Sequence, residues 1–306
     1  STLADSAIGV ALTCAYAELR ERFGEPIGES SGNPVQLSVL GLGKLGGREL
    51  NMSSDVDLVF AYRENGVTNG TQTISNHEFF IKLGQVLIDI LQTPTHEGIV
   101  FRVDMRLRPN GDSGPLALSF DAMDHYFLTH GRDWERYALI KARPVAGDVA
   151  AGHDLLASLR PFVYRKYLDF GAFESIRTMR TLIERELNKK SLTGNVKLGR
   201  GGIREIEFIV QSHQLIYGGR NPTLRTSSLY DALAALEDNG VLTDHDCAMM
   251  RRHYDFLRVL EHRLQIMDDA QTHTVPVEPL ARTRIALAMG YPGINAFDTA
   301  VESVND

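Results

Sequence analysis

Two aspartates in a short hydrophobic run are the residues with the clearest chemical potential in this sequence. The run DVDLVFAY, at residues 55–62, predicts a β-strand, in which successive side chains point to opposite faces. Val56, Leu58 and Phe60 therefore point to one face of this strand, and Asp55 and Asp57 point to the other. Two carboxylates on one face repel each other unless a cation holds both, and oxygen ligands suit Mg²⁺ or Mn²⁺.

A second run, IVFRVDMRLR at residues 99–108, repeats this alternation and predicts another strand. Its charged residues, Arg102, Asp104, Arg106 and Arg108, share one face. If the two strands are neighbours in a sheet, Asp104 joins the aspartate pair and the arginines flank it. Three carboxylates surrounded by guanidinium groups resemble a two-metal site with phosphate clamps, which suits an in-line displacement at phosphorus. A solvated edge strand with alternating charges is the structural alternative.

A glycine-rich turn, GLGKLGG at residues 41–47, precedes the aspartate strand. Its letters satisfy the dinucleotide-binding pattern GxGxxG, but only seven residues separate the turn from the first aspartate, too few for a crossover helix. The P-loop pattern fails as well, because neither Ser nor Thr follows Lys44. The sequence therefore predicts a backbone-lined turn that approaches a phosphate, with Lys44 and Ser54 as further donors. A tight turn with a solvated lysine remains the alternative.

A second glycine cluster opens a helical pattern later in the chain, in KLGRGGIREIEFIVQ at residues 197–211. Gly201 and Gly202 stand at the helix start, whose N–H groups predict an anion site. Glu207 lies next to the apolar stripe of this helix, and a buried carboxylate needs a partner. That partner is either an arginine of the helical region or a metal ion at the aspartates. The role of Glu205 is ambiguous from the sequence, and a simple salt bridge is one interpretation.

The wider pattern predicts an α+β fold in three regions. Residues 1–33 read as an N-terminal helix and a Gly/Pro-rich linker, and residues 34–147 as a catalytic domain of strands and helices. From residue 148 to 306 only helical patterns occur, which indicates an all-helical domain. Helices are expected at 76–92, in one or two pieces between 119 and 143, and at 171–190, 201–217, 227–238, 244–268 and 279–290.

Composition excludes several classes of protein. The chain has 306 residues and a net charge of −7, which argues against a broadly basic surface for nucleic acid. Cys14 and Cys247 are too few for a disulfide framework or a zinc knuckle and fit a reducing, cytoplasmic location. The apolar segment 7–17 resembles a signal-peptide core, but Asp5 stands where a basic residue belongs, and a membrane helix needs ~18–20 apolar residues. The missing initiator Met and the end at Asp306 suggest a fragment of a longer protein.

Four ordered motifs resemble one bacterial family. They look like segments of the glutamine synthetase adenylyltransferase/adenylyl-removing enzymes, and the resemblance extends from about residue 37 to residue 217 and is weaker beyond. The motifs are GLGKLGGRELNMSSDVDLVFAY (41–62), FRVDMRLRPNGDSGPL (101–116), GRDWERYALIKARP (131–144) and KLGRGGIREIEFIVQ (197–211).

The resemblance implies a polymerase-β-like nucleotidyltransferase domain, with a small mixed sheet and helices, followed by a helical domain. It implies that Asp55, Asp57 and Asp104 are metal ligands, and that Gly43 and Ser54 face the phosphate. Those enzymes have two nucleotidyltransferase halves, and this chain holds one aspartate strand and therefore one half. The wording RDWERYALIKAR and GGIREIEF looks like the adenylyl-removing half, because the adenylylating half has a Trp-Glu-His variant and GGITDIEF-like text.

The implied activity is phosphorolysis of AMP–tyrosine on adenylylated glutamine synthetase, with inorganic phosphate as co-substrate and ADP as product. Mg²⁺, or Mn²⁺ in its place, is the implied cofactor, and a PII signal protein is the implied regulator; neither nucleic acid nor a membrane is expected as a partner. Arg106, Arg108 and the helix start at residue 201 are candidates for steering the phosphate. Two alternatives stay open: the adenylylating half, which transfers AMP from bound ATP, and a catalytically silent docking module.

Overall fold

The computed structural model of the chain describes residues 1–166, 177–178, 181, 194–268 and 271–305. Its contacts divide the chain into two compact units, the first formed by Ser1–Leu50 and Ser54–Tyr164 and the second by Asn51–Ser53 and Arg165–Asp306. The second unit therefore includes a three-residue segment whose neighbours in sequence on both sides belong to the first.

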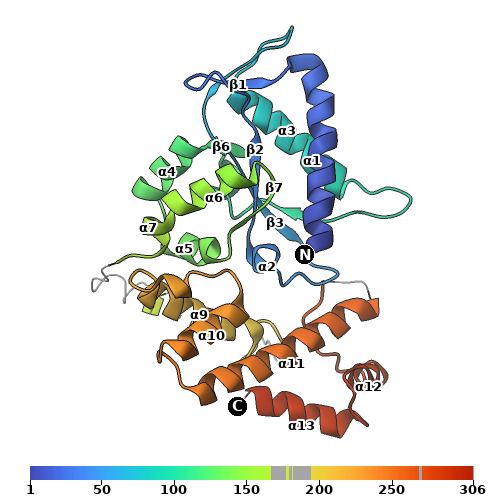
Figure 1. Ribbon diagram of the computed structural model, residues 1–306. Coiled ribbons are helices and arrows are strands. Elements are labelled where there is room, and N and C mark those ends of the chain that lie inside the picture. The colour runs from blue at the N-terminus through green and yellow to red at the C-terminus, as the bar shows by residue number, and fades with distance from the viewer. Residues whose placement is uncertain (167–176, 179–180, 182–193, 269–270, 306) are drawn as a thin grey trace. The chain divides into compact units, whose positions relative to one another are not determined.

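A five-stranded mixed sheet forms the centre of the first unit (Figure 1). Four strands follow the order β5-β3-β2-β7, and β6 also pairs with β3. The strand β2 is antiparallel to β3 and β7, whereas β3 is parallel to β5 and β6. The strands are β2 (Leu37–Gly41), β3 (Val56–Tyr62), β5 (Val103–Asp104), β6 (Ala117–Ser119) and β7 (Arg143–Gly147). A separate two-stranded sheet pairs β1 (Pro26–Gly28) with β4 (Gly66–Thr68).

Helices cover both faces of the sheet, and the alternation of β3 decides which side chains each layer meets. One face packs against α1 (Thr2–Phe23) and α3 (Asn76–Gln92), and the core there includes Val56, Leu58 and Phe60. The other face packs against α4 (Phe120–Thr129) and α6 (Val149–Ser158), where Val59 and Ala61 are buried. The short helices α5 (Asp133–Ile140) and α7 (Arg160–Val163) lie in the same unit (Figure 1). The face alternation predicted for residues 55–62 is thus confirmed.

The second unit is helical around its own core. Its helices are α9 (Ile203–Tyr217), α10 (Leu229–Asp238), α11 (Asp244–Asp268), α12 (Pro279–Ala288) and α13 (Ile294–Asn305). The long helix α11 supplies Tyr254, Leu257, Leu260 and Leu264 to that core, at the three- and four-residue spacing of one helix face. Short 3₁₀ turns lie at Gly111–Ser113 in the first unit and Pro222–Leu224 in the second.

The α+β class predicted from the sequence is confirmed, but several boundaries differ. The strand expected over 99–108 was wrong in extent, because only Val103 and Asp104 pair with β3 before the chain turns. The contact division falls after Tyr164, whereas the sequence placed the helical domain from residue 148; α6 stays with the first unit because it packs on β2 and β7. The helical pattern at 171–190 lies largely outside the described residues, and α13 was not predicted.

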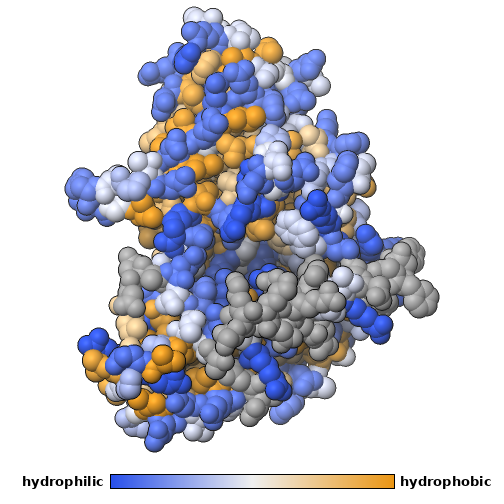
Figure 2. All heavy atoms as spheres, turned by 180° about the vertical axis from the view of Figure 1, so that it is seen from behind, coloured by the Kyte–Doolittle hydropathy of each residue, from blue (hydrophilic) through white to orange (hydrophobic). Residues whose placement is uncertain are grey.

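The described surface is chemically mixed. Figure 2 shows hydrophobic side chains scattered among hydrophilic ones over the first unit, on the side opposite to the view of Figure 1. Among the described residues, no helix combines the length and the apolar character that a membrane span requires.

A buried hydrogen bond between α1 and β2 gives a test of how the first unit is held together. The Leu37 N–H donates to the Tyr16 hydroxyl at 2.7 Å, and burial raises the pKa of that phenol. We expect Tyr16→Phe to lower the free energy of unfolding by about 1–2 kcal/mol, because it leaves a buried N–H without its acceptor. Urea unfolding followed by the fluorescence of Trp134, the single tryptophan, measures this unit. The exposed Thr13 on the same helix is the control: Thr13→Ala should change stability by less than about 0.5 kcal/mol.

Candidate active site

The parallel pairing of β3 with β5 places two of the predicted carboxylates side by side. The register joins Val56 to Val103 and Asp57 to Asp104. Neighbouring strands lie about 4.8 Å apart, and paired residues of parallel strands project to the same face. Since Val56 belongs to the core beneath α1 and α3, Asp57 and Asp104 project to the opposite face. The condition stated from the sequence, that the two strands be sheet neighbours, is met at these two positions.

The glycine turn after β2 lies directly against the Asp57 carboxylate. A short helix, α2 (Gly43–Gly46), begins at this turn, and the Leu42 N–H donates to the Asp57 carbonyl at 2.9 Å. Gly43 has a φ of 52°, and a Cβ atom there would lie 2.3 Å from Asp57 Oδ2. Glycine alone permits both this backbone conformation and this approach. Lys44 lies in α2, within the glycine turn, and Ser54 directly precedes Asp55 at the entry to β3.

Side chains from distant segments support the turn. Arg143 at the start of β7 donates to the Leu45 carbonyl at 3.1 Å and the Gly46 carbonyl at 3.3 Å, and its guanidinium pairs with both oxygens of Asp5 at 3.0 Å. Sequence reasoning did not find this support, because about a hundred residues separate the partners and no local pattern signals the contact.

A buried ion pair also supports the glycine turn. Lys141 Nζ lies 3.0 Å from Glu49 Oε2, and both side chains are less than 10% exposed. At Gly46, a Cβ atom would lie 1.8 Å from the Lys141 carbonyl oxygen, so the turn and the segment before β7 are in direct backbone contact. The charged residues of the motif at 131–144 therefore act, at these positions, as the scaffold of the glycine turn.

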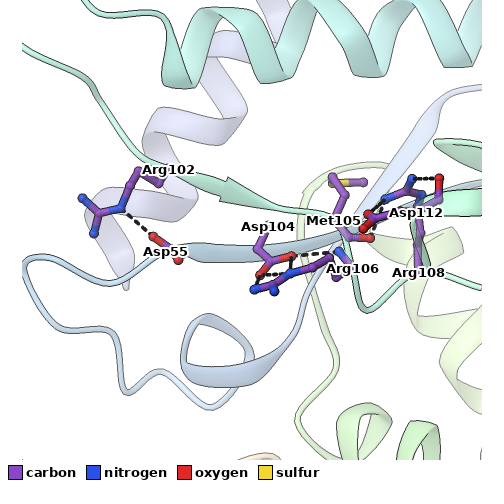
Figure 3. A network of polar contacts seen from close by, with 7 residues as sticks. All are labelled: Asp55, Arg102, Asp104, Met105, Arg106, Arg108 and Asp112. Atoms are coloured by element: carbon purple, nitrogen blue, oxygen red, sulfur yellow. Dashed lines mark hydrogen bonds and ion pairs between the residues drawn. The ribbon is translucent and has the colours of Figure 1, made fainter. Parts of the chain in front are cut away.

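Arg106 holds the carboxylate of Asp104 (Figure 3). Its Nε lies 3.1 and 3.0 Å from the two carboxylate oxygens, its terminal nitrogen lies 2.5 Å from Oδ2, and its backbone N–H donates to Oδ1 at 2.8 Å. These contacts hold the pKa of Asp104 below its ordinary value, with the Arg106 side-chain hydrogen bond as the main cause. The Arg106 side chain is 73% exposed, so this guanidinium sits at the solvent side of the carboxylate.

Asp55 has a different guanidinium partner. It lies one residue before β3, and its Oδ1 accepts from Arg102 Nε at 2.6 Å (Figure 3). Within the described residues, no group of three or more His, Cys, Asp or Glu side chains is arranged to hold a metal ion. The structure therefore pairs Asp57 with Asp104 by register and places Asp55 one residue before β3, against Arg102, and a metal site formed by all three carboxylates stays a prediction.

The Asp57–Asp104 pair nevertheless fits a divalent cation in its chemistry. Two carboxylates on adjacent strands are hard oxygen donors, and like charges so close together favour a cation between them. The Gly43 backbone packs so closely against Asp57 Oδ2 that a side chain at residue 43 would displace the carboxylate. These features suit Mg²⁺ or Mn²⁺ better than a softer metal.

Arg108 does not lie beside Arg106 as the predicted strand required. It is 8% exposed, and its guanidinium donates to the carbonyls of Met105, Gly114 and Asp112 at 2.8, 3.2 and 3.3 Å (Figure 3). Because these carbonyls belong to the turn that ends β5, Arg108 shapes the loop. The alternation predicted for 99–108 breaks after Asp104 for this reason.

The second glycine cluster differs from its expected form as well. The Gly201 N–H donates to the Glu205 carboxylate at 2.9 Å, and the Gly202 N–H donates to the Gly199 carbonyl at 3.0 Å. The next two amides of α9 donate to the carbonyls of residues 196 and 197. These bonds occupy the groups that an anion was expected to use, and they give Glu205 the role of closing the helix start. Glu207 lies half-buried on α9 of the second unit, and its part in a metal site stays a prediction.

Known proteins are similar to this chain over its whole length. The family model for glutamate-ammonia ligase adenylyltransferase matches residues 1–158, and that for GlnD PII-uridylyltransferase matches residues 177–306. Proteins described as bifunctional glutamine synthetase adenylyltransferase/adenylyl-removing enzymes are similar throughout: one from Hahella chejuensis is 52% identical over 100% of this chain and 32% of its own length. The corresponding protein of Nitrosococcus oceani is 52% identical over 99% of this chain and 31% of its own length. The chain thus spans about a third of these relatives.

The close approach at Gly43 makes a testable prediction about cation binding. We expect Gly43→Ala to weaken Mn²⁺ binding at least tenfold, because the new methyl group displaces the Asp57 carboxylate from its place opposite Asp104. Isothermal titration with Mn²⁺ measures the change.

Gly32 provides the matched control for backbone strain. Its φ is 66°, and a Cβ atom there would meet nothing within 4 Å. Both variants should lose about 1–2 kcal/mol of stability to the left-handed backbone, while only Gly43→Ala loses affinity for Mn²⁺. Equal Mn²⁺ affinity in the two variants would show that the turn does not shape a cation site.

Proposed function

Since the chain belongs to the glutamate-ammonia ligase adenylyltransferase family, a family of nucleotidyltransferases, we propose that it removes AMP from adenylylated glutamine synthetase. The observation that carries the proposal is the pair of in-register carboxylates, Asp57 and Asp104, against the backbone of Gly43. The choice of the adenylyl-removing half over the adenylylating half rests on the motifs at 131–144 and 197–211.

The proposed reaction is a phosphorolysis. An oxygen of inorganic phosphate forms a bond to the α-phosphorus of the AMP–tyrosine linkage, and the bond from that phosphorus to the tyrosine oxygen breaks. The products are ADP and the tyrosine side chain of glutamine synthetase, which takes up a proton from solvent. The phenol has a pKa of roughly 10, so the phenolate departs without strong help from a general acid. The demand on the protein is therefore positioning and charge balance.

Asp57 and Asp104, joined by Asp55, are the residues that would hold a divalent cation, which would neutralise negative charge on the phosphoryl oxygens. The backbone at Gly43 lines the approach to Asp57, and Lys44 adds a positive charge to the same turn. Both features favour the placing of a phosphoryl group beside the carboxylates.

Arg106 is the residue we assign to the incoming phosphate. Its guanidinium is exposed and pairs with the Asp104 carboxylate just after β5. Rotation about the side-chain bonds of Arg106 would bring this guanidinium to a second anion. Arginine's planar fork matches two phosphate oxygens at once. Arg108 is left out of this assignment, because three backbone carbonyls already hold it.

Adenylylated glutamine synthetase is the proposed protein substrate. The match of residues 177–306 to a PII-uridylyltransferase model supports a PII-type signal protein as regulator, acting on the second unit. Neither nucleic acid nor a membrane enters the proposal.

A product assay tests the proposed function. The chain is incubated with adenylylated glutamine synthetase, Mg²⁺ and phosphate, and ADP is measured with and without the phosphate. We expect phosphate-dependent ADP, and a loss of at least about a hundredfold in rate for Asp55→Asn, Asp57→Asn and Asp104→Asn, because each removes one charge from the cation-binding set. Asp89→Asn, at an exposed position of α3, is the control and should keep the wild-type rate.

Two outcomes would overturn the assignment. Transfer of AMP from ATP to unmodified glutamine synthetase, with no ADP formed from phosphate, would identify the adenylylating half. Tight binding of glutamine synthetase with neither reaction would identify a docking module.

A further inference from the structure

A short segment just before the catalytic strand is held by a buried polar network in the second unit. Asn51–Ser53 belongs by its contacts to that unit, while Ser54 and the strand β3 that follows belong to the first. Asn51 is 3% exposed, although it is a polar residue in a loop. Only three residues lie between it and Asp55, the first carboxylate of the proposed site.

Both ends of the Asn51 amide are used by charged side chains of α11. The Asn51 Nδ2 atom donates to Glu261 Oε2 at 2.7 Å, and its Oδ1 atom accepts from a terminal nitrogen of Arg258 at 2.6 Å. The other terminal nitrogen of Arg258 donates to the same Glu261 oxygen at 2.6 Å. Three side chains thus form a closed ring of hydrogen bonds. His273 Nδ1 approaches the second carboxylate oxygen of Glu261 at 3.0 Å.

The burial of this ring makes each bond expensive to break. Glu261 has no exposed surface and Arg258 is 8% exposed, so neither charge can turn to water when it loses a partner. Hydrogen bonds to charged groups are the strong ones, and leaving one end unpaired in the interior is costly. The Asn51 amide donates to the carboxylate through its nitrogen and accepts from the guanidinium through its oxygen. The segment is therefore fixed to α11 at residue 51.

We propose that Asn51 is a positioning residue which, through Arg258 and Glu261, fixes the chain that leads into the carboxylates of the catalytic strand. This inference rests on the proposed function. The first bond between β3 and the segment of β5 is the Val56 N–H to the Arg102 carbonyl, at 2.9 Å, and β5 is only two residues long. Such a short edge pairing frays readily unless the chain entering it is restrained. With Asn51 held, the register of Asp57 opposite Asp104 is restrained from the N-terminal side of β3.

Through the same contacts, the positions of the proposed site's carboxylates depend on α11. A change that moves Arg258 or Glu261 acts on Asn51 through buried bonds, and the segment from Asn51 to Asp55 is too short to absorb it by loose chain. Asn51 does not contact the reacting atoms in this account. Its effect on the reaction is indirect, through the placing of Asp55 and Asp57.

Asn51→Ala with His273→Ala as its matched control tests the proposal in the full chain. The first variant removes both bonds of the loop and leaves the Arg258–Glu261 pair, whereas the second removes a contact of the same glutamate and leaves both bonds of Asn51. Hydrogen exchange of the peptide covering residues 54–58, followed by mass spectrometry, is the first readout. We expect exchange to rise at least tenfold in Asn51→Ala and to stay within twofold of wild type in His273→Ala.

Kinetics and thermal unfolding provide the second readout. We expect Asn51→Ala to lower kcat about tenfold with KM for phosphate nearly unchanged, because the carboxylates are misplaced after substrate has bound. The melting of the helical unit, followed by circular dichroism, should fall by similar amounts in the two alanine variants, so a general loss of stability would affect both rates alike. Equal exchange at 54–58 and equal kcat in the two variants would refute the positioning role.

An exchange of the amide and the carboxylate gives a rescue test. Asn51→Asp alone places two carboxylates beside one guanidinium, and we expect the same rise in exchange as in Asn51→Ala. The double variant Asn51→Asp, Glu261→Gln restores one carboxylate, one amide donor and one arginine in the same ring, and should recover most of the protection. Failure of the double variant to improve on Asn51→Asp would contradict the ring. The exchange readout decides the proposal even if the wild-type chain forms no ADP, a result that would refute only the proposed function.

Discussion

Repulsion between like charges on neighbouring strands is the constraint on which the catalytic end of the sheet depends. Asp57 and Asp104 are paired in register, and strand spacing keeps their carboxylates close. The hydrogen bonds from the Arg106 guanidinium hold the pKa of Asp104 below its ordinary value. The Arg106 guanidinium thus balances the charge of Asp104, and the chemistry of the same carboxylate pair suits a divalent cation.

Several charged residues of the four motifs support this edge of the sheet without facing it. Arg143 and the Lys141–Glu49 pair hold the glycine turn, and Arg108 holds the loop that ends β5. Their guanidinium and ammonium groups are buried against carbonyls and carboxylates of the chain. Charge in a motif therefore indicates a site, but burial and the partner decide whether the residue meets a ligand or supports the residue that does.

Local periodicity explains which parts of this structure were predictable. The alternation in residues 55–62 predicted the faces of β3, and the regular apolar spacing of 244–268 predicted α11 at its observed bounds. Features set by hydrogen bonds between side chains and the backbone were missed. The strand at 99–108 stops at Asp104 because a turn held by buried Arg108 follows, and the anion site at Gly201 is closed by Glu205 of the same helix. Both errors came from charged or glycine residues whose partners are backbone groups.

The carboxylate pair by itself does not decide the direction of AMP transfer. A cation held there stabilises the α-phosphoryl group equally whether the tyrosine oxygen arrives or departs, so direction depends on which other oxygen is held in line. The motif at 131–144 supports the turn that carries Gly43 through Lys141 and Arg143. Its residues can therefore act on the backbone against Asp57 without contacting a substrate. In the proposed reaction, the direction of transfer would therefore depend on the shape of this turn and on Arg106, the residue proposed to bind the incoming phosphate.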